Sequence, residues 1–280
     1  MNYLIKRRSA TFFKYIAVFI VLVWTLFPLY WMLNNSFKTR VEQFSIPPTA
    51  YPSNPTMENY VALFTGSMNF MNPLLNSMIV AFSATAISVI IGALAAYSLS
   101  RFRFKLKLPI LFWVLVTKVF PPVTLAIPLY MIMADIGLLN TRLALILAYI
   151  VFTLPFSIWM LINFFNEVSI EIEESAMIDG ASYFKVFYKV VLPLVLPGIA
   201  ATAIFNLILA WNEFLYALIF IQRPGLTTVP VSLAGLVTEH QVLWGPMSGG
   251  GVLSIIPIVI FVLWMQDYLV KGLTMGSVKG

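Results

Sequence analysis

The chain lacks the residues on which most metal and nucleophilic chemistry depends. It has no cysteine and one histidine, His240, in 280 residues. Disulfides, thiolate metal sites and multi-histidine metal sites are therefore excluded, and a Ser/His/acid catalytic set is not credible. No G-x-x-x-x-G-K-[ST] pattern occurs, because the dipeptide Gly-Lys is absent altogether. The sequence predicts a non-catalytic protein with no metal, cofactor or nucleotide site of its own.

Charge is also scarce. Charged residues make up 10% of the chain and hydrophobic residues 60%, which excludes an ordinary soluble domain. A net charge of +6 could suggest a nucleic-acid partner, but the charges lie between long apolar runs, where they set membrane topology instead. We expect one all-α integral membrane domain over residues 1–280, with no nucleic-acid partner. Its six spans are expected at approximately 15–33, 74–99, 109–134, 143–166, 194–221 and 252–270.

The first apolar run follows a short basic segment, Met1–Lys14. A cleaved secretory signal is the competing interpretation, but the run is too long and no small-residue cleavage site follows it. The next segment, Lys38–Pro73, is polar and contains five prolines, which favour stiff, extended backbone. We expect a folded external loop there. Whether it is a passive connector or grips a partner stays open.

The second expected span carries small residues at every fourth position. In lipid, helices associate by close backbone approach, and small side chains permit it. The pattern favours packing within the chain over a dimer seam, because a protein with many spans has many internal seams. The residues of this stripe are Ala84, Ser88, Gly92, Ala96 and Ser100.

Basic residues are distributed unevenly between the two sides of the membrane. Six spans place both termini on one side, which holds twelve Lys and Arg, whereas the other side holds four. The positive-inside rule then places both termini in the cytoplasm, together with residues 169–193.

Residues 169–193 form a charged island between two apolar runs. Ser169 can cap a first short helix, whose opening turns are acidic. Asp179-Gly180 marks a turn, because glycine takes positive φ without strain. Ser182 can cap a second helix, and Pro193 suits the first turn of a third. The sequence predicts a helical hairpin.

This island resembles the "EAA" signature of ABC-importer membrane subunits. The resemblance rests on Glu174-Ser175-Ala176, Gly180 and Val190-x-Leu192-Pro193, with Ser175 and Val190 departing from the usual alanine and isoleucine. It implies an ABC type I importer-like fold, in which this coupling helix pair docks on an ATPase subunit. A loop lying on lipid headgroups is the alternative, but such helices are usually basic. The implied coupling residues are Glu174, Ser175, Ala176, Asp179, Gly180, Leu192 and Pro193.

Two ionisable residues, Lys118 and Glu213, are expected at membrane depth. Such residues are costly in lipid and default to a functional hypothesis. Glu213 lies in Trp211-Asn212-Glu213-Phe214, and Asn206 shares its helix face. This cluster could stack on and hydrogen-bond a polyhydroxylated ligand. A structural Lys118–Glu213 ion pair, or snorkelling of Glu213 to the outer interface, is the alternative. The candidate pathway residues are Lys118, Asn206, Trp211, Asn212 and Glu213.

Further motifs resemble carbohydrate permeases of the maltose-transporter class, specifically the smaller permease subunit. They are Ile136–Thr141, Trp211–Phe214 and the tail from Lys271 to Gly280. The resemblance implies a heterodimer with a second permease subunit in a prokaryotic cytoplasmic membrane. It also implies two ATPase subunits that bind ATP and Mg²⁺, and an extracytoplasmic sugar-binding protein.

The resemblance further assigns two contact regions. The external loop Thr227–Gly250 enters the binding protein, with Trp244, Gly249 and Gly250 as contact residues, and the tail Thr274–Gly280 meets the ATPases. Two other functions stay open: an ABC permease for an amino acid, peptide or phosphate ester, and a stand-alone secondary transporter. Inverted repeats would support the second, and none is visible.

Overall fold

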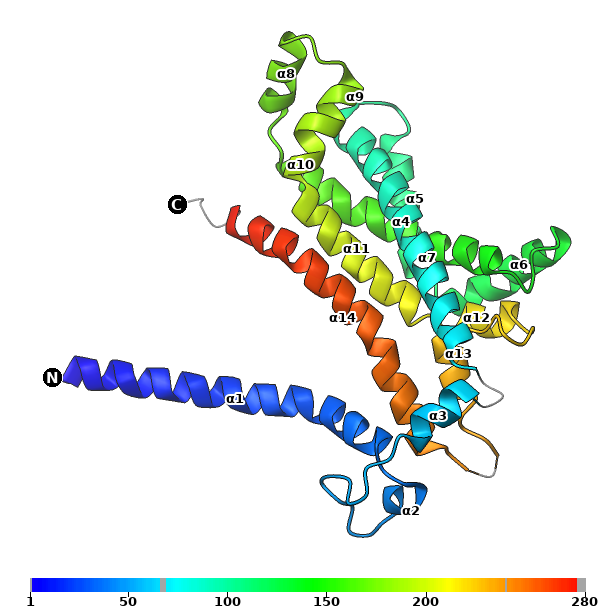
Figure 1. Ribbon diagram of the computed structural model, residues 1–280. Coiled ribbons are helices and arrows are strands. Elements are labelled where there is room, and N and C mark those ends of the chain that lie inside the picture. The colour runs from blue at the N-terminus through cyan, green and yellow to red at the C-terminus, as the bar shows by residue number, and fades with distance from the viewer. Residues whose placement is uncertain (1, 66–68, 240, 276–280) are drawn as a thin grey trace. The chain divides into compact units, whose positions relative to one another are not determined.

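The computed structural model describes residues 2–65, 69–239 and 241–275, with the side chains of 2–10, 12, 118–119 and 269–275 left undescribed. Regular structure in this part is almost all helical (Figure 1). The chain separates into two compact units, Met1–Phe70 with Leu233–Ile255, and Met71–Ser232 with Ile256–Gly280. We call them unit 1 and unit 2 and describe each by itself.

Unit 1 contains a folded polar loop, as predicted for Lys38–Pro73. It follows α1 (Asn2–Ser36) and includes α2 (Arg40–Gln43) and α3 (Glu58–Thr65). The Asn59 amide donates to the carbonyls of Ser36 and Lys38 at 2.9 and 2.8 Å. The Lys38 ammonium is buried, donates to the Thr49 carbonyl at 2.6 Å and lies 4.9 Å from the centre of the Trp31 ring. These bonds satisfy the backbone of a loop that has little helix.

The run Gly249–Gly251 corrects one prediction, because it lies in a helix and not at the end of an external loop. α14 begins at Trp244 and runs to Met275. A Cβ added to Gly250 would lie 2.5 Å from the Leu233 side chain, and one added to Gly251 would lie 2.7 Å from Met32 Sδ. Glycine is present there because neighbouring elements of unit 1 approach the helix closely. Close packing outweighs the low helix propensity of glycine.

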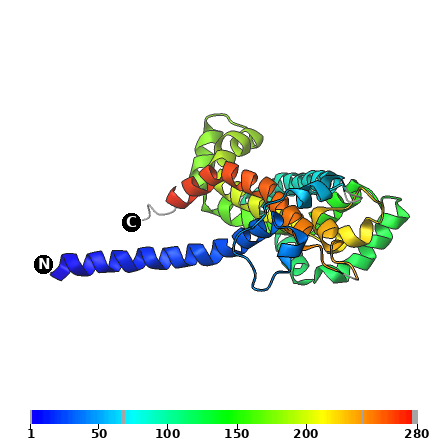
Figure 2. The ribbon, with the colours of Figure 1, turned by 60° about the horizontal axis from the view of Figure 1, so that its bottom comes forward.

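Unit 2 is built on three helices that lie side by side: α4 (Met71–Arg101), α7 (Arg142–Glu167) and α11 (Leu196–Trp211) (Figures 1 and 2). The small-residue stripe faces inward, as predicted for packing within the chain, with Ala84, Ser88 and Ala96 fully buried. A Cβ on Gly92 would lie 2.5 Å from Ser157 Cβ, and Ser88 and Thr153 share a 2.7 Å hydrogen bond. The seam between α4 and α7 is therefore too close for larger side chains.

The fifth expected span, 194–221, is not one helix. α11 ends at Trp211, and a separate α12 (Leu215–Phe220) follows. At the other end, the axis bends by 75° between residues 183–194 and α11, where Pro197 supplies no backbone N–H at the start of the helix. Between α11 and α12, Glu213 accepts hydrogen bonds from two backbone amides, which starts a new helix.

The remaining expected spans correspond to helices with somewhat different bounds. α5 (Lys107–Val119) and α6 (Pro122–Asp135) meet at a bend of 102°, next to Pro121. Among the described residues, four unbroken helices are long and apolar enough to cross a membrane, or up to six if each bent pair is one span. This agrees with an all-α membrane fold.

Candidate functional site: a helical hairpin and the opposite end of its bundle

The predicted hairpin is present, and both of its caps are as predicted. α8 (Ile170–Ile178) is capped by Ser169, whose hydroxyl accepts from the Glu171 N–H at 3.3 Å. α9 (Tyr183–Val186) is capped by Ser182, which accepts from the Lys185 N–H at 3.4 Å. A π-helical turn (Phe187–Val191) and α10 (Leu192–Leu194) continue the second arm. Hydroxyl caps of this kind satisfy amides that have no partner within the helix.

Gly180 closes the turn between the arms. Its φ is +84°, a conformation that strains residues with a side chain. The Ala181 N–H donates to the Ala176 carbonyl and the Gly180 N–H to the Met177 carbonyl, both at 3.0 Å. This pair of bonds is the Schellman pattern, which fixes the direction of the chain after a helix. The turn is thus held by its own backbone.

The signature residues divide into an outward and an inward set. Glu174, Ser175, Asp179 and Gly180 are exposed, as is Pro193, whereas Ala176 and Leu192 pack on a buried cluster. The outward surface also carries large apolar side chains, and we call these the hairpin apolar patch. Its members are Ile170, Ile172, Ile178, Tyr183, Phe184 and Tyr188.

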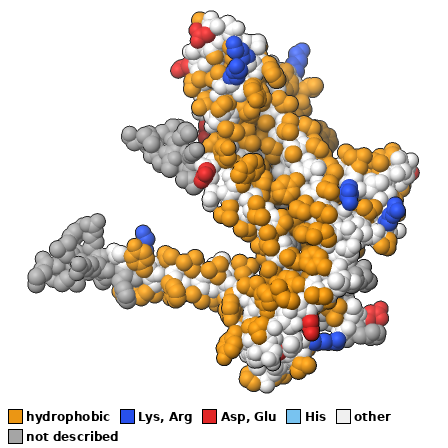
Figure 3. Space-filling view, in the orientation of Figure 1, with side chains coloured by type: hydrophobic (Ala, Val, Ile, Leu, Met, Phe, Trp, Pro, Cys, Tyr) orange, Lys and Arg blue, Asp and Glu red, His pale blue; other side chains and the backbone are white. Residues whose placement is uncertain are grey.

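The hairpin end of unit 2 differs in charge from the bundle beside it. Acidic and basic side chains gather at that end, whereas the visible face of the bundle is largely hydrophobic (Figure 3). An exposed surface that mixes apolar and acidic groups on a rigid turn is suited to binding a protein partner.

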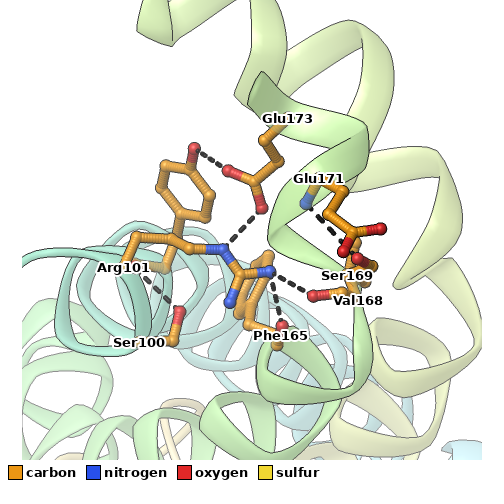
Figure 4. Close-up of polar contacts among 8 residues, drawn as sticks. Ser100, Arg101, Phe165, Val168, Ser169, Glu171 and Glu173 are labelled. Atoms are coloured by element: carbon orange, nitrogen blue, oxygen red, sulfur yellow. Dashed lines mark hydrogen bonds and ion pairs between the residues drawn. The ribbon is translucent and has the colours of Figure 1, made fainter. Parts of the chain in front are cut away.

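A buried ion pair at the base of the hairpin escaped the sequence analysis. Arg101 Nε donates to Glu173 Oε1 at 2.5 Å, and the Tyr97 hydroxyl donates to Glu173 Oε2 at 2.8 Å. Figure 4 shows the guanidinium also reaching the carbonyls of Phe165 and Val168. In the sequence, Arg101 is one of the twelve Lys and Arg counted for membrane topology, and Glu173 is one of the acids in the opening turns after Ser169. No local pattern joins residues 72 positions apart.

At the opposite end of the bundle, Glu213 caps α12. Its two carboxylate oxygens accept from the N–H groups of Tyr216 and Ala217 at 2.8 and 3.1 Å. The carboxylate also borders a cavity of about 360 Å³. The other lining residues are mostly apolar or aromatic, and two of them, a threonine and a tyrosine, also carry a hydroxyl. They are Thr117, Phe120, Pro122, Phe152, Pro155, Leu209 and Tyr216.

Three other pathway candidates, Asn206, Trp211 and Asn212, do not line this cavity. Trp211 is 4% exposed and belongs to the packed core, while Asn206 is fully buried and donates to Ser157 Oγ at 2.6 Å. Asn212 is exposed and bonds the Ile208 carbonyl of its own helix. The Lys118 side chain lies outside the described residues, so its pairing with Glu213 stays a prediction. Among the candidate pathway residues whose side chains are described, Glu213 alone lines the cavity.

The Ile136–Thr141 motif has a structural role at this end. Gly137 and Asn140 take positive φ, and the Asn140 carboxamide oxygen accepts from the N–H groups of Gln222 and Arg223 at 2.7 and 2.9 Å. Thr141 caps α7 by accepting from the Ala144 N–H at 3.2 Å. The motif therefore fixes the connection that follows α12.

The three predicted binding-protein contacts lie in unit 1 and differ in exposure. Trp244 is 46% exposed at the start of α14, whereas Gly249 and Gly250 are buried inside that helix. Their expected place on an exposed loop is wrong, because their missing side chains accommodate neighbouring groups. The predicted ATPase contact of the tail falls on Thr274–Gly280, which lies outside the described side chains.

Comparison with known proteins is informative over nearly the whole chain. Residues 88–275 match the family described as binding-protein-dependent transport system inner membrane component. The sulfoquinovosyl glycerol transport system permease protein SmoH of Agrobacterium fabrum is 39% identical over 95% of this chain and 93% of its own length. The trehalose/maltose transport system permease protein MalG of Thermococcus litoralis is 38% identical over 95% of each chain.

The fold is shared with a solved transporter. One chain of a bacterial ABC transporter involved in the import of the acidic polysaccharide alginate superposes with a TM-score of 0.76 at 21% identity. The match covers 93% of this chain and 96% of the other. These similarities oppose the hypothesis of a stand-alone secondary transporter. By sequence over most of its length and by fold, the chain belongs to the inner-membrane components of binding-protein-dependent transport systems.

Proposed function

We propose that this chain is one of two permease subunits of an ATP-driven carbohydrate importer. A second permease subunit completes the translocation pathway. Two ATPase subunits, which bind ATP and Mg²⁺, dock on the hairpin from the cytoplasm, where both termini of this chain also lie. An extracytoplasmic sugar-binding protein delivers the cargo. ATP binding closes the ATPases, displaces the hairpin, and opens the pathway outward.

The geometry of the hairpin is the observation that carries this proposal. Ser175 and Gly180 present small surfaces that allow a partner to approach closely, and Glu174 and Asp179 give the surface an acidic rim. Ile178, 85% exposed, and Phe184, 73% exposed, offer apolar anchors. Such anchors, surrounded by charge, are typical of specific protein interfaces. The ATPase is the occupant that the family supplies on the cytoplasmic side.

Carbohydrate cargo is supported by the relatives and by the cavity at the opposite end. SmoH and MalG are named for sugar or sugar-glycerol transport. The cavity combines the aromatic rings of Phe120, Phe152 and Tyr216 with the carboxylate of Glu213. Aromatic faces bury the C–H faces of sugars, and a carboxylate accepts hydrogen bonds from hydroxyls.

Co-purification tests the docking part of the proposal. The affinity-tagged chain is expressed with its neighbouring transport genes and purified from membranes. We expect a nucleotide-binding subunit to co-purify, and Ile178→Glu to remove it, because the substitution charges the most exposed apolar anchor. Asp135→Lys, an exposed change at the far end of α6, is the matched control and should leave the complex intact.

Transport tests the cargo. The purified complex is reconstituted with its binding protein, and ATP-dependent uptake is compared for trehalose, maltose, an amino acid mixture and glycerol phosphate. Uptake confined to a sugar supports the proposal. Uptake confined to an amino acid or phosphate ester would replace the cargo, and uptake without any ATPase would overturn the architecture.

A further inference from the structure

Two consecutive acids of the hairpin have opposite environments. The Glu174 side chain is exposed on α8, whereas Glu173 is 2% exposed and lies at the base of the hairpin. A carboxylate is seldom buried unless it is paired. Glu173 is therefore unavailable to a docked subunit and must act inside unit 2.

The partner of Glu173 joins three elements through one guanidinium. Arg101 is the last residue of α4, and its Nε donates to Glu173 on α8. Its Nη2 donates to the carbonyls of Phe165 and Val168 at 2.7 and 2.9 Å. Both carbonyls lie at the C-terminal end of α7, where the last carbonyls have no partner within the helix. The planar fork of arginine can hold such a set, and lysine cannot.

Aromatic rings enclose this pair. The Tyr97 ring lies 5.6 Å from that of Phe165 and 4.9 Å from that of Phe187, between ring centres. Phe187 belongs to the second arm of the hairpin, and the buried cluster around it includes Val186 and Val191. Both arms thus rest on the ends of α4 and α7. Because the pair is removed from water, losing either partner would leave an uncompensated buried charge.

We propose that Arg101 is a positioning residue for energy coupling. Tyr97, Arg101 and Glu173, which we call the clamp, fix α8 to α4 and α7, so that displacement of the hairpin moves both helices as one body. Without the clamp, α8 would pivot about its connection to α7 and absorb the displacement locally. The mechanical part of this inference depends on geometry alone, while its consequence for transport rests on the proposed function.

Distance measurement between spin labels tests the mechanical part on the assembled complex. Because the chain has no cysteine, Lys185→Cys and Leu94→Cys provide the only two labels on it, one on an exposed position of α9 in the hairpin and one on an exposed position of α4. We expect a narrow distance distribution with the clamp intact. In Glu173→Gln a second, broad population should appear, because detached hairpins become about 100-fold more frequent when the buried guanidinium loses its charge partner.

Matched variants separate this effect from a general loss of stability. Glu171→Gln, an exposed acid of the same helix, should leave the distribution narrow, and Tyr97→Phe, which removes one hydroxyl, should broaden it less than Glu173→Gln. The double variant Arg101→Gln/Glu173→Gln should be no worse than the worse single variant, because it removes both charges together. A narrow distribution in Glu173→Gln and Arg101→Gln would overturn the clamp, as would equal broadening in Glu171→Gln.

The ratio of uptake to ATP hydrolysis tests the consequence for transport. Reconstituted complexes with Glu173→Gln should hydrolyse ATP while sugar uptake per ATP falls about tenfold or more, and Glu173→Asp should recover part of the ratio. Clamp variants with an unchanged ratio would overturn the coupling role. If the unmodified complex shows no ATP-driven uptake, the proposed function fails, while the spin-label result still decides the mechanical part.

Discussion

Glu173 and Glu213 lie at opposite ends of the bundle formed by α4, α7 and α11, and they are held by different chemistry. Glu173 is buried against a guanidinium and a tyrosine hydroxyl. Glu213 is half-buried, accepts two backbone amides and borders a cavity. An arginine pair makes a rigid joint that is closed to other ligands, whereas an amide-capped carboxylate keeps lone pairs for a ligand. Under the proposed function, this difference suits one end to force transmission and the other to solute contact.

A substitution in the contact between α4 and α7, which runs between the two ends, should have the largest effect on stability and transport. Gly92→Leu would place side-chain atoms where a Cβ already lies 2.5 Å from Ser157 Cβ. Overpacking of this kind costs about 1–3 kcal/mol or more, because α4 and α7 must separate. We expect lower thermal stability in detergent together with loss of both uptake and stimulated ATP hydrolysis. Leu94→Phe on the exposed face of α4 is the control, and equal damage there would discredit the seam.

The hairpin turn gives the next largest effect. Gly180→Val should strain a residue at φ +84° by about 1–2 kcal/mol, although beyond its two chain neighbours no heavy atom lies within 4 Å of the new Cβ. ATP hydrolysis should then lose its coupling to uptake while the amount of protein in the membrane is unchanged. Gly180→Asn should be milder, because asparagine tolerates this conformation. Full coupling in the valine variant would show that the turn need not be rigid.

Glu213→Gln sharpens the contrast between the ends. An uncharged amide keeps one acceptor oxygen, so one N–H of α12 loses its cap at a cost of about 1 kcal/mol. We expect weaker uptake at limiting sugar, measured as a higher half-saturation concentration, with unchanged uptake per ATP. If this variant uncoupled ATP hydrolysis as a clamp variant is expected to, the two ends would not differ in role.

Glu42 in unit 1 gives the smallest expected effect, which is a change in protection of the Ser53 amide with pH. The Ser53 N–H, above all, holds the pKa of the Glu42 carboxyl below its ordinary value of 4.5, with help from Thr49. A lowered folded-state pKa contributes stability above the unfolded value, and the contribution is lost as pH falls through the folded pKa. The protection factor of the Ser53 amide, which is the intrinsic exchange rate at a given pH divided by the observed rate, should therefore be high at neutral pH and fall below that pKa. Glu42→Gln should remove most of this pH dependence; an unchanged pH profile would contradict the bond.

Local signals in the sequence predicted the hairpin well. Ser169, Ser182 and Gly180 act within three residues of themselves, so their caps and turn could be inferred from spacing alone. The inward-facing small-residue stripe of α4 could also be predicted, from its four-residue spacing. The resemblance assigned Glu174 to docking, but the sequence did not show that Glu173 is buried, because its burial depends on Arg101, which is distant in the chain. It also placed the glycine run in a loop, since propensity does not reveal which neighbours require a missing side chain.

The sidedness and accessibility of the hairpin turn test the central claim most directly. With Asp179→Cys as the only cysteine of the chain, a membrane-impermeant maleimide is applied to intact cells and to inside-out vesicles. The account predicts labelling only in inside-out vesicles, and protection when the ATPase subunits are assembled on the complex. Labelling in intact cells, or labelling in vesicles that assembled ATPase does not reduce, would contradict it.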